Sequence, residues 1–212
     1  TPASNSAKPE RDTSLSIAIT AIIDHARKHQ HNEHTLLLYA HRFTHQPAAA
    51  FAGPESDKVL VELILQYVQY LPQLIDEFQV LCHRYGWQSI AQKSNHIIGS
   101  FFERHHHSLQ VAGIVGLLDK VYFAHRLIEE IHDHLMCQIG HPATAWNMTT
   151  ANLIMHQLLG NEYSAKLDET VIELAHKLTK KAPAITVAEK QKSQTDVWPC
   201  FCRQYGEDFS FR

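Results

Sequence analysis

The apolar residues of this chain recur at helical spacing over most of its length. Steps of three and four residues connect many of those between residues 13 and 46, namely Leu15, Ile19, Ile22, Ala26, Leu36, Ala40 and Phe43. This spacing matches the 3.6 residues per turn of an α-helix. The pattern predicts one long amphipathic helix that ends before Pro47, with His29 and Glu33 filling a gap in its apolar stripe.

Breaks in the same periodicity separate the helices that follow. Apolar residues keep helical phase from residue 56 to residue 85, where Pro72 is expected to kink or divide the helix and Gly86 to end it. A third helix is predicted from about residue 87, running into the histidines at 105–107.

The segment from about residue 108 to residue 139 has the widest apolar surface of the chain and predicts the central helix of a bundle. We expect the first helix to pack against it. A short helix at 149–159 and a last helix reaching Pro183 follow. The outward strip of the central helix is predicted to hold Asp119, Arg126, Glu130 and Asp133.

These elements predict an all-α, single-domain bundle of about six helices over residues 13–183. Residues 1–12 are polar, contain two prolines and predict a disordered lead-in. Residues 184–212 lose the periodicity and predict an irregular segment that docks on the bundle or on a partner. Its aromatic residues are Trp198, Phe201, Tyr205, Phe209 and Phe211.

Composition narrows the classes of function. The net charge of −3 over 212 residues offers no basic surface for nucleic acid, and no apolar run is long enough to span a membrane. The four cysteines have no disulfide-like spacing, which favours a reducing, cytoplasmic location, although a signal peptide removed before Thr1 stays an alternative. Cys200 and Cys202 form a single Cys-x-Cys pair, which is a weak signal for a soft metal.

Histidine is unusually frequent, with 17 residues against 19 lysines and arginines. By helical phase, three polar residues in the central helix point inward. In the first helix, His29 and Glu33 lie in the apolar stripe and His25 lies at its edge. Facing each other, they would supply imidazoles and carboxylates suited to zinc, iron or manganese. The predicted metal ligands are His25, His29, Glu33, His125, Glu129 and His132.

The element Glu129-x-x-His132 is similar to the Glu-x-x-His element of ferritin-like di-iron proteins, in which two helices each carry one copy. A second copy here, Glu103 with His106, begins at a glutamate that faces outward by helical phase. The likeness covers four residues and identifies no family.

Three hypotheses about function follow from these observations. The leading one is a non-enzymatic binding or regulatory protein that engages a protein partner or itself through a helical face and the aromatic C-terminus. The alternative is a metal protein of iron, manganese or zinc, as an oxidoreductase or a hydrolase. In a third, protonation of inward histidines makes the bundle sensitive to pH, whereas purely architectural histidine–glutamate pairs would explain the same spacing.

Overall fold

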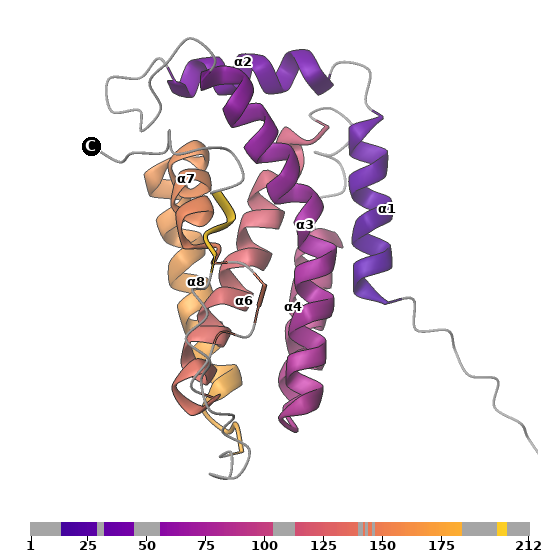
Figure 1. Cartoon of the computed structure of the whole chain (residues 1–212), viewed down its shortest axis with the longest axis vertical. Coiled ribbons are helices and arrows are strands. Elements are labelled where there is room, and N and C mark those ends of the chain that lie inside the picture. The colour runs from indigo at the N-terminus through magenta and orange to yellow at the C-terminus, as the bar shows by residue number, and fades with distance from the viewer. Residues whose placement is uncertain are drawn as a thin grey trace, which may run out of the picture.

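The computed structural model describes residues 14–28, 32–44, 56–103, 113–139, 142, 144–145, 147–183 and 199–202. Within these ranges the protein is all-α, as predicted, with seven α-helices and one short 3-10 helix (Figure 1). In chain order they are α1 (Leu15–Arg27), α2 (Asn32–Thr44), α3 (Ser56–Arg84), α4 (Gln88–Glu103), η1 (Val115–Leu117), α6 (Leu118–Ile139), α7 (Thr149–Leu159) and α8 (Asn161–Thr179).

The first predicted helix is in fact two helices. α1 ends at Arg27, and α2 begins at Asn32 and lies across the end of the bundle (Figure 1). The nine residues 27–35 contain no apolar side chain, so no burial holds that stretch in one straight helix. The gap in the stripe was therefore a break between elements. The predicted lead-in, residues 1–12, lies outside the described residues.

Pro72 does not divide α3, which runs unbroken over 29 residues. Apolar residues on both sides of the proline, including Leu71 and Leu74, are fully or almost fully buried. We infer that this burial offsets the backbone hydrogen bond that proline cannot make. Asp57 in the first turn, and His83 and Arg84 in the last, complement the helix dipole.

The helices pack around a shared apolar core. α6 contacts α3, α4, α7 and α8, whereas α1 and α2 pack chiefly on α3 and not on α6 as expected from the sequence. The Tyr39 hydroxyl donates to the Leu158 carbonyl oxygen at 2.6 Å and joins α2 to α7. No helix in the described ranges combines the length and the apolar character that a membrane span needs.

Two glycines, one after the end of α3 and one inside α4, offer a matched pair of substitutions. Gly86 follows α3 with a φ of +73°, and an added Cβ would meet no atom within 4 Å. Gly86→Ala should therefore lower the free energy of unfolding by about 1 kcal/mol through backbone strain alone. Gly99 is helical, and its Cβ would lie 3.5 Å from Leu15 Cδ1, an ordinary contact. Gly99→Ala should raise stability by roughly 0.5–1 kcal/mol.

Urea unfolding of the two variants beside the wild-type protein measures both changes. Equal shifts in the same direction would contradict this account of Gly86.

Candidate functional site

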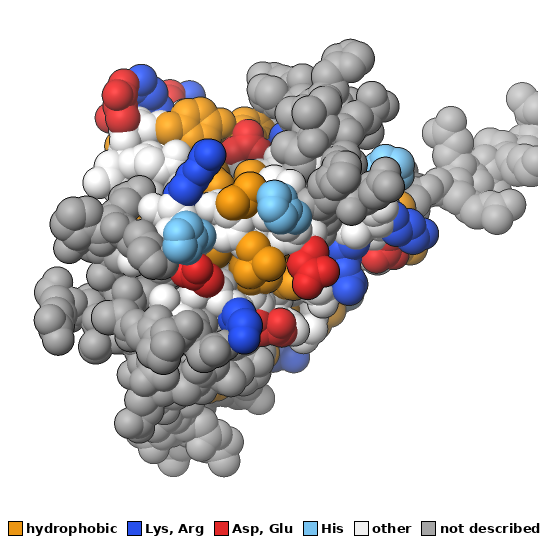
Figure 2. Space-filling model, turned by 90° about the horizontal axis from the view of Figure 1, so that it is seen from above, with side chains coloured by type: hydrophobic (Ala, Val, Ile, Leu, Met, Phe, Trp, Pro, Cys, Tyr) orange, Lys and Arg blue, Asp and Glu red, His pale blue; other side chains and the backbone are white. Residues whose placement is uncertain are grey.

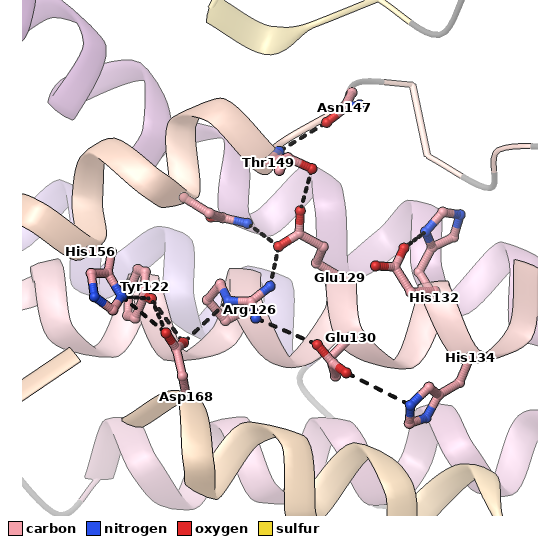
Figure 3. Close-up of polar contacts among 12 residues, drawn as sticks. Tyr122, Arg126, Glu129, Glu130, His132, His134, Asn147, Thr149, His156 and Asp168 are labelled. Carbon is pink, nitrogen blue, oxygen red and sulfur yellow. Dashed lines mark hydrogen bonds and ion pairs between the residues drawn. The ribbon is translucent and has the colours of Figure 1, made fainter. Parts of the chain in front are cut away.

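Among the described residues, the most connected polar cluster lies where α6, α7 and α8 meet, with Arg126 of α6 at its centre (Figure 3). Arg126 Nε donates to Asp168 Oδ1 of α8 at 3.2 Å. Its Nη1 pairs with Glu129, and its Nη2 lies 3.5 Å from Glu130 Oε2. One guanidinium thus joins three carboxylates from two helices.

Asp168 is the second centre of this cluster. Tyr122 Oη donates to both carboxylate oxygens of Asp168, at 2.8 and 3.0 Å. His156 Nδ1 of α7 lies 3.0 Å from Asp168 Oδ2 and 3.0 Å from Tyr122 Oη. Because an ionised carboxylate only accepts hydrogen bonds, His156 donates through Nδ1 and keeps its proton there.

Glu129 connects the cluster to the start of α7. Its Oε1 accepts from Thr149 Oγ1 at 2.9 Å, and its Oε2 accepts from Asn152 Nδ2 at 2.7 Å. Asn152 in turn accepts from the buried Tyr67 hydroxyl of α3 at 2.6 Å. Asn147 Oδ1 accepts from the Thr149 backbone N–H at 3.0 Å and precedes α7 (Figure 3). The network therefore spans α3, α6, α7 and α8.

Burial and charge set the protonation states in this network. Burial alone would lower the pKa of Arg126, but the carboxylates of Glu129 and Asp168 outweigh it and raise that pKa above its ordinary value. Burial also raises the pKa of Tyr122, and the hydrogen bond to Asp168 raises it further. Burial likewise raises the pKa of Tyr67 well above its ordinary value. At neutral pH the cluster therefore holds a fixed cation and neutral phenols.

His125 occupies the interior beside this network. It is fully buried, and its ring stacks on Tyr67 with centroids 4.0 Å apart. Its Nε2 lies 3.0 Å from the Tyr67 carbonyl oxygen and so must donate, which leaves Nδ1 as an acceptor with no partner among the described residues. Burial lowers the pKa of His125 to about 3, so the ring is neutral at all ordinary pH values.

The six predicted metal ligands separate into two groups. His125, Glu129 and His132 face inward as helical phase predicts and, with other residues, line one cavity large enough for about one water molecule. Glu33 on α2 is exposed, contrary to expectation, because helical phase was carried across the break between α1 and α2. His25 is exposed because it lies beside the buried face of α1, which Ile19, Ile23 and Ala26 form. His29 lies outside the described residues.

In the described part of the chain, no group of three or more His, Cys, Asp or Glu side chains is arranged to hold a metal ion. His132 Nδ1 lies 3.4 Å from Asp133, and the oxygens of Glu129 already accept from three other side chains. The three inward residues of α6 therefore serve different partners. His106, of the second Glu-x-x-His element, lies outside the described residues, and Glu103 is exposed.

Sequence reasoning missed much of the observed cluster. Arg126 was expected on the outward strip, but it is only 19% exposed because α7 and α8 cover that side of α6. A signal was present at Asn152, a polar residue inside the apolar stripe of α7. His156 and Asp168 carried no comparable signal, since each has ordinary helical surroundings in the sequence.

The cluster resembles catalytic machinery only in part. A histidine oriented by an aspartate is a common general base. However, within the described residues no serine, threonine or cysteine side chain donates to the His156 ring, and Ser164 Oγ instead donates to the His156 backbone carbonyl at 2.8 Å. The polar groups of the cluster pair with one another, and through these pairs the cluster links α6, α7 and α8.

Comparison with known proteins adds no family to this description. No protein-family model, no curated protein and no solved structure matched the chain. The fold and the site together define an all-α helical bundle whose α6, α7 and α8 are joined by a partly buried ionic network.

Proposed function

We propose that this chain is a helical binding protein, rather than an enzyme, and that it engages a protein partner through the outward face of α2. The observation that carries this proposal is the pair Leu37 and Leu38, which are 37% and 47% exposed side by side on that helix. Apolar surface in water is costly, and covering it by a partner gains free energy.

α2 has apolar residues on its outward side as well as on the side that faces the bundle. Leu36, Ala40 and Phe43 already bury the inward side of the helix against the bundle. Leu37 and Leu38 are therefore not needed for the core. α2 lies across one end of the molecule (Figure 1), so this outward face lies at that end.

Polar side chains frame the two leucines. His34, His41 and Arg42 are exposed on α2, and His41 pairs with Asp57 at 2.9 Å. Figure 2 views this end of the molecule and shows hydrophobic side chains between histidines, with acidic and basic side chains around them. The partner that fits offers an apolar patch bordered by carboxylates, because imidazole and guanidinium N–H groups donate hydrogen bonds to carboxylate oxygens.

Photo-crosslinking in cells tests the proposal. A benzophenone amino acid at position 38 should capture a protein that the same group at position 172 does not, since Ile172 on α8 is equally exposed at 49%. With the captured protein purified, the double variant Leu37→Ser/Leu38→Ser should weaken binding at least tenfold, about 1.4 kcal/mol. Ile172→Ser should leave the affinity unchanged.

Self-association is measured with the same variants. A dimer in sedimentation equilibrium that is lost in the Leu37/Leu38 double variant would make the partner a second copy of this chain. A monomer at all concentrations, together with no crosslink specific to position 38, would overturn the proposal for α2.

A metal role is the second candidate, because His125, Glu129 and His132 line the same cavity. An ion there would need Glu129 to exchange its bonds from Arg126, Thr149 and Asn152 for the metal. Plasma mass spectrometry of untagged protein decides between the two. Near one iron, manganese or zinc per chain, lost in Glu129→Ala, would favour the metal protein, and only traces would count against it.

A further inference from the structure

The second half of α3 borders a hollow at the surface of the protein. The hollow has a volume of about 680 Å³, and its lining residues on α3 follow one another mostly in steps of three and four, so they share one face of the helix. They are Gln73, Asp76, Glu77, Val80, Leu81 and Arg84. Val80 is 60% exposed, and among the described large apolar residues only Ile17, at 61%, is more exposed. The face therefore has an exposed apolar centre.

The ionisable residues on this part of α3 are separated by sign. Asp76 and Glu77 lie four and three residues before Val80, whereas His83 and Arg84 lie three and four residues after it. At a rise of about 1.5 Å per residue, each pair lies about one helical turn from Val80 along the axis. The face is therefore acidic on one side of Val80 and basic on the other, at matching distances.

Two of these charges are available to a partner. Among the described residues, neither the Asp76 carboxylate nor the Arg84 guanidinium has a hydrogen bond or an ion pair, and both residues are exposed. Glu77, in contrast, accepts hydrogen bonds from Tyr70 Oη at 2.8 Å and from the Ala145 backbone N–H at 3.2 Å. These bonds hold Glu77 in place, and Ala145 lines the hollow beside it.

We propose that this face of α3 binds the same face of a second copy of the chain, as an antiparallel helix pair whose two-fold axis passes at Val80. Such an axis brings residues before Val80 in one copy opposite residues after Val80 in the other. The acidic end of each face then meets the basic end of the other, twice in each dimer, and the two Val80 side chains meet at the axis.

The charge pattern selects this arrangement. In a parallel pair, Asp76 would meet Asp76 and Arg84 would meet Arg84, and like charges opposite each other repel. The pattern is self-complementary only when the two helices run in opposite directions, which is the reason for inferring a second copy and not an unrelated protein. The inference does not depend on the role proposed for α2.

The dimer should be weak and sensitive to salt. A contact made by one helix face belongs to the small interfaces, below about 1,200 Å² in total, which are typical of weak association. A dissociation constant on the order of 100 µM is therefore expected at low ionic strength. It should rise with added sodium chloride, because Asp76 and Arg84 remain at the solvent-exposed rim of the contact.

Sedimentation equilibrium of the purified full chain tests the proposal. Asp76→Arg removes the acidic end of the face, and Arg84→Asp removes the basic end. Each variant alone should therefore self-associate at least tenfold more weakly than the wild type. An equimolar mixture of the two variants should recover dimers about as stable as the wild-type dimer, because each variant supplies the charges that the other lacks. Both positions are exposed on α3, so the variants should fold as the wild type does.

Three further variants locate the contact. Val80→Asp should abolish the dimer, because it places two carboxylates at the two-fold axis. Leu37→Ser/Leu38→Ser on α2 and Ile172→Ser on α8 should leave the dimer unchanged, which distinguishes a failure of the α3 face from a failure of the α2 face.

Two results would overturn the proposal. A wild-type protein that stays monomeric up to about 1 mM would do so, and would leave the α3 face to a partner of another sequence. A dimer that persists in Val80→Asp and is lost in Leu37→Ser/Leu38→Ser would move self-association from α3 to α2.

Discussion

The free energy of unfolding should fall by about 1.4 kcal/mol for each pH unit below about 6.5, because of one buried histidine. His125 is fully buried, and burial lowers its pKa to about 3 in the folded chain. In the unfolded chain the same group titrates near 6.5. Between these values the unfolded state binds one more proton than the folded state. The contribution of neutral His125 to the free energy of unfolding is therefore fully present above pH 6.5 and is lost progressively as the pH falls toward 3.

His125→Phe isolates this contribution. Phenylalanine keeps an aromatic ring to stack on Tyr67 and removes the titrating group, at the cost of the hydrogen bond to the Tyr67 carbonyl oxygen. Urea unfolding at several pH values between 5 and 7 should show a shallower dependence for the variant than for the wild type. His96→Gln, at an exposed position on α4, should leave the slope unchanged. Equal slopes for wild type and His125→Phe would contradict the role of His125.

The end of a helix could be predicted from the sequence where a glycine follows it. Gly86 and Gly160 have positive φ values and follow α3 and α7 as the pattern indicated. The inward direction of His125 and His132 also followed from helical phase, and both are at most 2% exposed. Phase describes one helix at a time, and here it was sufficient.

Helical phase gave the wrong side-chain direction where a helix ends and another begins, or where a helix distant in the sequence covers the residue. It was carried across residues 27–35, where α1 ends and α2 begins, and therefore placed Glu33 incorrectly. It also placed Arg126 in solvent. Asp168, the partner of Arg126 on α8, lies 42 residues away, and no single-helix pattern indicates which neighbour covers a given face.

Arg126→Met should lower the free energy of unfolding by about 2–4 kcal/mol, the largest effect expected of a single substitution in the polar cluster. Removing one partner of a fully buried ion pair costs about 3–5 kcal/mol. The side chains here keep some exposure, from 11% at Glu129 to 22% at Asp168, so water screens part of that cost. The variant leaves the carboxylates of Glu129, Glu130 and Asp168 without the cation that they share.

A second substitution separates charge from packing. In Arg126→Met/Asp168→Asn one uncompensated charge is gone, so the double variant should recover about 1 kcal/mol or more of the loss. If it is no more stable than the single variant, lost packing of the arginine stem explains the effect instead. Lys177→Met breaks the ion pair with Glu173, whose two side chains are 65% (Lys177) and 67% (Glu173) exposed. This variant should cause no measurable change in the free energy of unfolding. The contrast between the Arg126 and Lys177 variants tests whether the partly buried network, and not ion pairing in general, holds α8 to α6.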